Sequence, residues 1–279
     1  MVFSHSSFKQ LLADATPVQI AGVFNAYTAL AATQVGHRAL YLSGSTAAFS
    51  TLGRRTVALP ELVELVGLAR QITDTTDLPL LVDINNGWNG THLIQAIREL
   101  EQVGVAAVHI DDHEPYNVLG GSVSKPIVSK KAMIDTIAKA VDTRSRSQLY
   151  IIAHTDAFAQ EGLHAAIDRA ADYVKAGADA IYVESATSLA DYQHLTEAIG
   201  VPVIAMVDAL AKYPLFRPTE LEQAGVSMIV HPMNGFEFAN GEMQHAYQAL
   251  LDCCCDHGAH IDMTAVGAMQ ERRELQTHR

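Results

Sequence analysis

A short pattern that occurs four times limits what this chain can fold into. In each copy an Ala-Gly or Val-Gly pair comes a few residues before an apolar run that ends in a polar residue, as in Val35-Gly36 before Leu40–Ser43. The other copies have their glycines at Gly104, Gly177 and Gly225. A glycine that closes a helix just before a short strand is typical of parallel α/β proteins.

Four further apolar runs alternate with these copies along the chain, at Gln19–Phe24, Leu78–Asp83, Leu149–His154 and Val201–Val207. Eight strands with room for a helix between each pair predict a closed (β/α)8 TIM barrel with parallel strands. Apolar residues at helical spacing predict a leading helix over Ser4–Ala15 across the base of the barrel, and the chain should end in a partly helical tail. At 279 residues, we expect residues 1–279 to form a single domain.

In such barrels the chemistry lies at the carboxyl ends of the strands. Polar residues at these ends should therefore converge on one mouth, and we predict this for Tyr41, Ser43, Asp83, Asp111, His113, His154, Glu184, Asp208 and His231. Two neighbouring acids, Asp83 and Asp111, are costly to hold together without a cation or a shared proton, which favours a functional role. His109 is expected to lie one residue out of phase with the mouth and to have a structural role.

Composition and charge limit the kinds of molecule that this protein is expected to bind. The formal net charge is −12, and no basic run exceeds two residues, which argues against nucleic acid or an anionic membrane and favours a small-molecule partner. We see no apolar stretch long enough to span a bilayer and no leader peptide. We expect the three consecutive cysteines, Cys253–Cys255, to serve as small apolar residues near a helix end. A metal site is less well served, because three adjacent side chains on a helix point in different directions. We therefore expect a cytoplasmic protein.

Several segments together carry a family resemblance: Tyr41–Ser45, Leu80–Asp83, His109–Asp112, Ile127–Lys130 and Thr155–Ala157. In these, and from about Phe8 to Leu275, the chain resembles the isocitrate lyase/phosphoenolpyruvate mutase superfamily, above all its methylisocitrate lyase branch. The resemblance implies a (β/α)8 barrel that forms a homo-oligomer, a dimer or tetramer. It also implies C–C or C–P bond chemistry on a 2-oxo acid or its enolate with a divalent metal, usually Mg²⁺.

Part of the family's apparatus is retained. By resemblance, Tyr41, Ser43, Gly44 and Ser45 hold the carboxylate of the oxo acid. Asp83 matches the first aspartate of the Asp-x-Asp metal motif, Asp111 stands where a metal-linked glutamate is usual, and Glu184 matches a family carboxylate.

Much of the rest has changed, and the changes fall at the mouth. The second aspartate of Asp-x-Asp is Asn85, and another metal-linked aspartate is Thr56. A loop at His113–Lys130 should form a lid, but Asn117–Gly121 replaces the lid motif whose cysteine acts as acid and base. His154 replaces an arginine that grips the substrate, and Met206 and Asp208 replace an Asn and a Thr. An absent general acid costs about 10²–10⁴ in rate, and loss of the arginine forfeits a charge-assisted pair worth about 2–3 kcal/mol. Because of these two losses together, we do not expect useful methylisocitrate cleavage.

The new residues suggest three alternatives for the metal. Histidines beside carboxylates suit Mn²⁺ or Zn²⁺ better than Mg²⁺, so the ion could have changed. The Mg²⁺ site could instead be retained in weakened form, or the site could work without metal. In the last case Arg55, in the loop before Thr56, could supply the positive charge.

We predict a lyase-type enzyme that makes or breaks a C–C bond of a small or medium oxo- or hydroxy-carboxylic acid through an enolate-like intermediate. Its predicted catalytic residues are His154, His113 and Asp111, and its predicted metal ligands are Asp83, Asp111 and Asn85. The predicted substrate-binding residues are Tyr41, Ser43, Gly44, Ser45, Asp208, Glu184, Arg55 and His231. The alternatives are a hydrolase, decarboxylase or isomerase, or a non-catalytic ligand-binding barrel.

Overall fold

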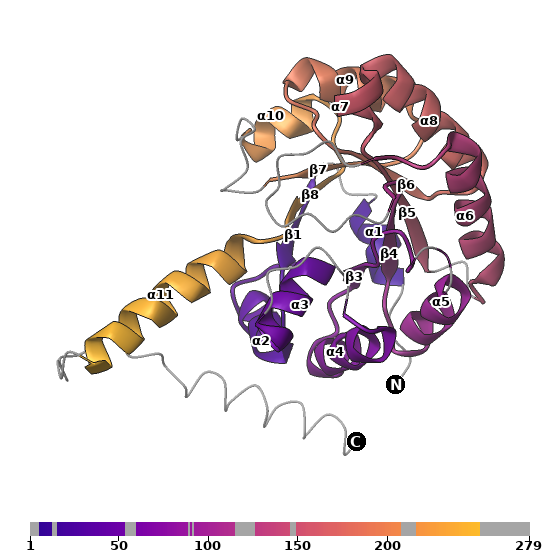
Figure 1. The fold of residues 1–279 in the computed structure, drawn as a ribbon. Coiled ribbons are helices and arrows are strands. Elements are labelled where there is room, and N and C mark those ends of the chain that lie inside the picture. The colour runs from indigo at the N-terminus through magenta and orange to yellow at the C-terminus, as the bar shows by residue number, and fades with distance from the viewer. Residues whose placement is uncertain are drawn as a thin grey trace. The chain divides into compact units, whose positions relative to one another are not determined.

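Eight parallel strands close into a barrel in chain order, as predicted (Figure 1). The computed structural model describes residues 6–12, 16–53, 60–88, 90, 92–114, 126–145, 149–207 and 216–251. Pairing of Val18 with Met228 joins the last strand to the first. The strands are Val18–Gly22 (β1), Ala39–Leu42 (β2), Leu80–Asp83 (β3), Ala107–Asp111 (β4), Tyr150–Thr155 (β5), Ala180–Val183 (β6), Val203–Met206 (β7) and Met228–His231 (β8).

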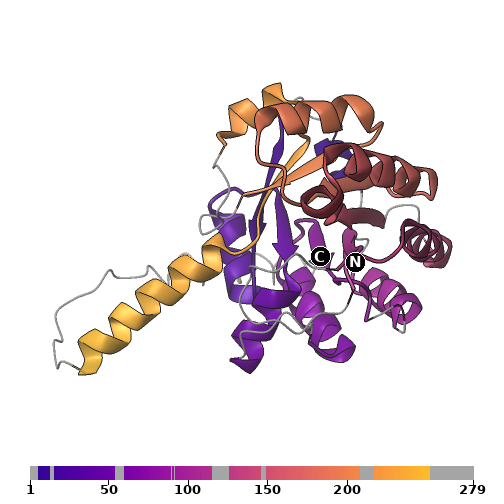
Figure 2. The ribbon, with the colours of Figure 1, turned by 45° about the horizontal axis from the view of Figure 1, so that its top comes forward.

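Helices between the strands surround the barrel (Figures 1 and 2). Gly36, Gly104, Gly177 and Gly225 have φ angles of 94°, 85°, 105° and 82°, the left-handed conformation that lets the chain leave a helix and enter the next strand. The helices are Ala26–Gln34 (α2), Gly44–Leu52 (α3), Leu62–Thr75 (α4), Leu93–Gln102 (α5), Lys130–Thr143 (α6), Ala157–Glu161 (α7), Leu163–Lys175 (α8), Leu189–Ala198 (α9) and Pro218–Gln223 (α10).

The alternation of side chains along each strand makes two apolar layers. One set faces the barrel interior, and the other packs against the surrounding helices. The leading helix, Ser6–Leu12 (α1), caps the interior layer at the base: Phe8 is buried and meets Tyr150 edge-on at a centroid distance of 5.1 Å. This confirms the predicted leading helix over Ser6–Leu12, and the rest of the range predicted for it lies outside the described residues.

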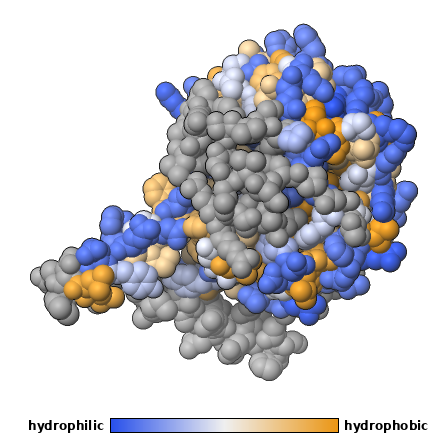
Figure 3. Space-filling view, viewed as in Figure 1, coloured by the Kyte–Doolittle hydropathy of each residue, from blue (hydrophilic) through white to orange (hydrophobic). Residues whose placement is uncertain are grey.

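The chain divides into two compact units, Met1–Phe236 and Glu237–Arg279. The last described helix, Asn234–Leu251 (α11), provides the described part of the second unit. Apolar side chains are exposed along it, among them Phe238, Tyr247, Leu250 and Leu251, and Figure 3 shows apolar residues at its end. The single domain stays a prediction, and the tail with Cys253–Cys255 lies outside the described residues. Within the described part, no helix combines the length and apolarity that a membrane span requires.

Gly22, at the end of β1, has no room for a side chain. A Cβ atom there would lie 2.2 Å from the carbonyl oxygen of Pro232 and 2.4 Å from that of His231. Gly22→Ala should therefore lower the free energy of unfolding by about 1–3 kcal/mol. Gly67→Ala in α4 is the control, since nothing lies within 4 Å of its Cβ, and it should raise stability by up to about 1 kcal/mol. Urea unfolding that shifts equally in both variants would contradict the argument.

Candidate functional site

The ends of β3 to β6 bring a cluster of titratable side chains into the barrel interior. In β4, Val108 and Ile110 pack in the outer layer, so His109 and Asp111 both face inward. Our expectation for the phase of His109 was wrong, because residues two apart on a strand share a face. The buried His109 ring stacks on His154 with centroids 5.0 Å apart and planes 4° apart.

Asp111 is the centre of this cluster. Its Oδ1 accepts a hydrogen bond of 2.8 Å from His154 Nδ1, and its Oδ2 lies 3.0 Å from His113 Nε2, which also donates to it. Burial acts to raise the pKa of Asp111, but the imidazoles of His154 and His113 outweigh burial and hold the pKa well below its usual value. Asp111 is therefore a buried carboxylate with a histidine on each oxygen.

His154 is surrounded by carboxylates. Its Nε2 lies 3.7 Å from Glu184 Oε2 and 3.8 Å from Asp156 Oδ2, and it makes no hydrogen bond to any described residue. Burial acts to lower the pKa of His154, but Asp111, Asp156 and Glu184 outweigh burial and raise the pKa to about 10. Without a metal ion, His154 therefore carries a positive charge at neutral pH where the resemblance expects an arginine.

Tyr41 and Asp83 extend the cluster toward β2 and β3. The Tyr41 hydroxyl lies 3.2 Å from His109 Nδ1 and hydrogen-bonds to Asp83; burial, then Asp83 and Asp111, raise its pKa well above the usual value. Asn85 has a φ of 44°, and its backbone N–H donates to Asp83 Oδ1 while its carbonyl accepts from the Asp111 N–H. Asn85 thus links the two acids through its backbone.

Ser43, Gly44 and Ser45 form the junction of β2 and α3. Ser43 is buried, and its carbonyl accepts hydrogen bonds from Thr46 Oγ1 and the Ala47 N–H. The first N–H groups of a helix have no partner within the helix, and its dipole favours an anion there. The start of α3 therefore suits the carboxylate binding that the resemblance implies.

Other predicted residues lie elsewhere. His231 shares the face of Ile229 on β8, bonds to the Val207 backbone, and has a pKa lowered by burial. Arg55 and Asp208 lie outside the described residues, as do Thr56 and Asn117–Gly121. The two ends of the predicted lid loop are described: His113 and Ile127 form an antiparallel bridge, and His113 Nε2 lies 3.0 Å from Asp111 Oδ2, so these two ends lie together near Asp111.

The sequence reasoning missed a second buried network, centred on Asp112. This carboxylate is fully buried and accepts hydrogen bonds from Thr155 Oγ1 (2.6 Å), Tyr173 Oη (2.8 Å) and the Asp156 N–H (2.9 Å). Arg169 lies 3.7 Å away and donates to the carbonyl of Val128, near the end of the predicted lid loop. An acid directly after Asp111, and an arginine among alanines of α8, were the signals available in the sequence.

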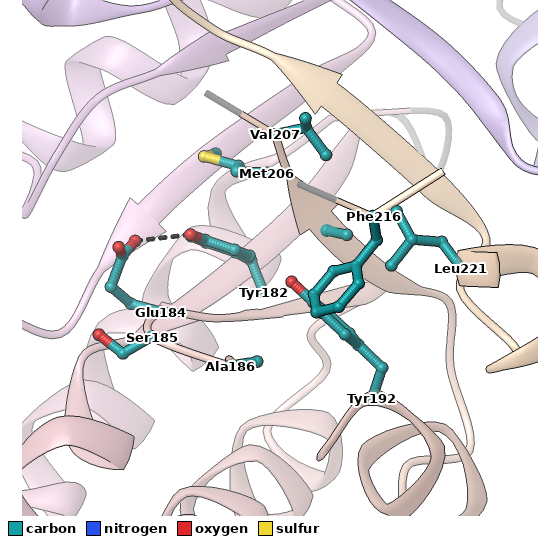
Figure 4. A pocket seen from close by; sticks show the side chains of 10 residues that line it. Tyr182, Glu184, Ser185, Ala186, Tyr192, Met206, Val207, Phe216 and Leu221 are labelled. Atoms are coloured by element: carbon teal, nitrogen blue, oxygen red, sulfur yellow. Dashed lines mark hydrogen bonds between the residues drawn. The ribbon is translucent and has the colours of Figure 1, made fainter. Parts of the chain in front are cut away.

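A cavity opens beside the cluster, at the ends of β6 and β7 (Figure 4). It encloses about 350 Å³, counting space open to solvent. Glu184 and Tyr182, joined by a hydrogen bond of 2.6 Å, lie on one side, and Tyr192, Phe216 and Leu221 line the other. Apart from Glu184 and Ser185, the described residues that line it are apolar or aromatic, and none of them is cationic. The cavity suits a small apolar group better than a carboxylate.

The described histidines and acids form two groups that could hold a divalent metal ion. One consists of His109, Asp111 and His154, and the other of His154, Asp156 and Glu184; the ligand atoms within each lie within 4.8 Å of one another. Asp83 belongs to neither group. The predicted ligand Asp111 fits an ion poorly, since both of its oxygens already accept hydrogen bonds from imidazoles.

Comparison with known proteins places the chain among lyases. It is 41% identical to the 2-methylisocitrate lyase of Shewanella oneidensis, over 88% of this chain and 84% of that protein. It is 31% identical to the 2,3-dimethylmalate lyase of Eubacterium barkeri, over 88% and 85%. The structure of an oxaloacetate acetylhydrolase superposes with a TM-score of 0.89 at 22% identity, covering 99% of this chain and 96% of that one, which confirms the fold.

These relatives confirm the predicted class, a lyase-type enzyme acting on carbon–carbon bonds. The family profile described as phosphoenolpyruvate phosphomutase matches residues 8–251, and a 2,3-dimethylmalate lyase of known structure, with a TM-score of 0.87, is a member of the PEP mutase/isocitrate lyase superfamily. The chain therefore belongs to the phosphoenolpyruvate phosphomutase family, within the superfamily that its sequence resembles.

Proposed function

We propose that this enzyme cleaves a malate-type substrate: a 2-hydroxy acid with a second carboxylate on the neighbouring carbon and a small alkyl substituent. The observation that carries this proposal is the cluster of Asp111, His113 and His154 at the strand ends, beside a cavity whose described lining is apolar or aromatic apart from Glu184 and Ser185. Relatives named 2-methylisocitrate lyase and 2,3-dimethylmalate lyase support the same substrate class.

In the proposed reaction a base takes the proton of the substrate hydroxyl, and the bond between the hydroxyl carbon and its neighbour breaks. The electron pair stays on the neighbour as an enolate of the second carboxylate, the hydroxyl carbon becomes the carbonyl of a 2-oxo acid, and a proton then adds to the enolate. The Asp111–His113 pair moves the proton, between atoms 3.0 Å apart, beside the base of the lid. The N-terminus of α3 binds the carboxylate of the oxo-acid end.

A bound divalent ion would stabilise the negative charge of the enolate. The superfamily resemblance implies Mg²⁺, whereas the imidazoles among the possible ligands favour Mn²⁺ or Zn²⁺. We retain Asp83 as a residue on which activity depends, because it joins Tyr41 and Asn85 at the edge of the cluster. We also propose a cytoplasmic homo-oligomer, a dimer or tetramer, which the exposed apolar residues of α11 support.

The test is release of the 2-oxo acid from 2-alkylmalates, methylisocitrate and oxaloacetate, with Mg²⁺, Mn²⁺ or Zn²⁺ added in turn; 2-methylmalate would give pyruvate, and longer 2-alkylmalates would give the correspondingly longer 2-oxo acid. We expect release from at least one 2-alkylmalate, its loss with a chelator, and its loss in Asp83→Ala. Glu197→Gln, on the exposed face of α9, should retain full activity. If no substrate in the panel is cleaved with any ion, the lyase proposal fails for this substrate class.

The cavity should set the size of the alkyl substituent. Val207→Phe, just after the end of β7, would fill the cavity and should lower kcat/KM for 2-propylmalate relative to 2-methylmalate by about tenfold or more, since each methylene in an apolar pocket is worth roughly 10–200-fold. Val63→Phe makes the same change at a side chain that is 75% exposed on α4, and should leave the ratio unchanged. An unchanged ratio in Val207→Phe would show that the substituent binds elsewhere.

A further inference from the structure

His154 presents its two ring nitrogens to different carboxylates. Nδ1 donates to Asp111, whereas Nε2 faces Glu184 Oε2 at 3.7 Å and Asp156 Oδ2 at 3.8 Å, without a hydrogen bond to any described residue. We infer that His154 Nε2, Asp156 and Glu184 form a binding site for a first-row divalent transition metal ion, at the ends of β5 and β6. This places the ion away from Asp83 and Asn85, where the resemblance expects Mg²⁺.

The distances favour this group over the one that contains His109. Two ligand atoms about 2.1 Å from one ion, at angles of 90–110°, lie roughly 3.0–3.4 Å apart. His154 Nδ1 and Asp111 Oδ1 are 2.8 Å apart, which is the length of a hydrogen bond and too short for an ion to be shared in this way. The separations of 3.7 and 3.8 Å around Nε2 need to close by only a few tenths of an ångström.

The surroundings of His154 are those of a metal-binding histidine. Such residues almost always donate their second N–H to a carboxylate, a backbone carbonyl or water, which fixes the tautomer and the ring orientation, and here the carboxylate of Asp111 has that role. The ring is also held by stacking on His109 and by contact with Tyr182, whose ring centroid is 4.6 Å away. Tyr182 in turn orients Glu184 by a hydrogen bond of 2.6 Å. The nitrogen is therefore held in place before an ion arrives.

Charge and access agree with this assignment. Asp111, which faces Nδ1 of His154, also pairs with His113, whereas Asp156 and Glu184 both face Nε2, so a divalent ion on that side would neutralise the charge of two carboxylates. Glu184 has a side chain that is 28% exposed and lines the cavity in Figure 4, so an ion held there could be reached from the cavity. One imidazole with two carboxylates suits Mn²⁺ or Zn²⁺, whereas Mg²⁺ prefers oxygen ligands and water.

The test measures Mn²⁺ binding to the whole, substrate-free protein, so that a failure of the lyase proposal does not affect it. Thiolates such as those of Cys253–Cys255 are poor Mn²⁺ ligands, which makes Mn²⁺ the cleaner probe. Calorimetry gives the affinity and stoichiometry, and pulsed electron paramagnetic resonance detects a coordinated nitrogen. We expect one Mn²⁺ with nitrogen coupling that disappears in His154→Gln.

The variants separate the possible sites. Glu184→Gln and Asp156→Asn should each weaken Mn²⁺ binding at least 10-fold, and Asp111→Asn about 10–100-fold as an outer partner. Asp83→Asn and the surface control Glu197→Gln should change the affinity for Mn²⁺ by less than 2-fold. Glu184→Gln keeps the size of a partly exposed side chain, and its thermal unfolding curve checks that it folds.

Three results would overturn the inference. The first is that the protein does not bind Mn²⁺. The second is that Mn²⁺ binds without nitrogen coupling and that its affinity depends on Asp83. The third is that the affinity depends on Asp111 but not on Glu184.

Discussion

Replacing Asp111 with asparagine should lower kcat/KM for the proposed lyase reaction by about 10²–10⁴, the usual contribution of a positioned acid or base. The carboxylate accepts hydrogen bonds from His113 and His154 through different oxygens. An amide keeps the shape but has only one acceptor oxygen and no charge, so one imidazole loses its partner and both lose the ion pair. Asp111→Asn therefore disturbs both the Asp111–His113 pair, which is proposed to move the proton, and His154, which is the proposed metal ligand.

Steady-state kinetics at several pH values measures this effect, with Asp135→Asn as the matched control on an exposed side chain of α6. In the metal-free protein, the pKa of His154 should also fall from about 10 toward its ordinary 6.5, because the largest favourable charge is removed. Because the pKa of His154 is higher in the folded state than the 6.5 of an unfolded histidine, its protonation stabilises the fold. This stabilisation is fully present at pH values below 6.5 and is lost as the pH rises through about 10. Full activity in Asp111→Asn would rule out the proposed role of the cluster.

Replacing Asp112 with alanine should lower the free energy of unfolding by about 3 kcal/mol or more. The change would leave the donors of Thr155, Tyr173 and the Asp156 backbone buried without their acceptor, and each such group costs about 1–3 kcal/mol. Arg169 would lose a buried counter-charge 3.7 Å away, although Glu161 still pairs with it. The loss should be among the largest for any single substitution in the barrel.

Urea unfolding followed by circular dichroism gives this free energy. Asp135→Ala, which removes an exposed acid paired with Lys131, should change stability by less than about 0.5 kcal/mol. If Asp112→Ala proves no more destabilising than Asp135→Ala, then water must satisfy the three donors. Because Asp112 fixes the backbone of Asp156 beside His154, the same variant should also weaken Mn²⁺ binding.

Local patterns in the sequence were enough to predict the barrel. The glycines at the helix ends, such as Gly104 and Gly177, have the left-handed φ angles that their position before a strand requires. The apolar runs became strands whose polar ends, from Tyr41 to Glu184, lie at the ends of neighbouring strands. These features depend on a few adjacent residues and on a periodicity of two, so they can be read from a single sequence.

The roles of individual side chains were decided by tertiary contacts. The alternation of side chains along a strand places His109 on the same face as Asp111, and this can be read from the sequence. No local pattern shows that the His109 ring stacks on His154 of the next strand. The sequence likewise shows only that Asp112 follows Asp111. Its contacts with Tyr173 and Arg169 of α8 appear only in the folded chain. Contacts between residues far apart in sequence depend on packing, which a single sequence does not record.

The sequence by itself therefore determined the fold, the family resemblance and part of the candidate site, including Asp111, His113, His154 and Glu184, but not Asp112 or Asp156. The tertiary structure alone decided how these residues pair: that Asp111 accepts from two histidines, and that His154 turns its second nitrogen toward Asp156 and Glu184. The physical reason is that hydrogen bonding and metal binding depend on distances of a few ångströms and on ring orientation, which are fixed only when the strands close into a barrel.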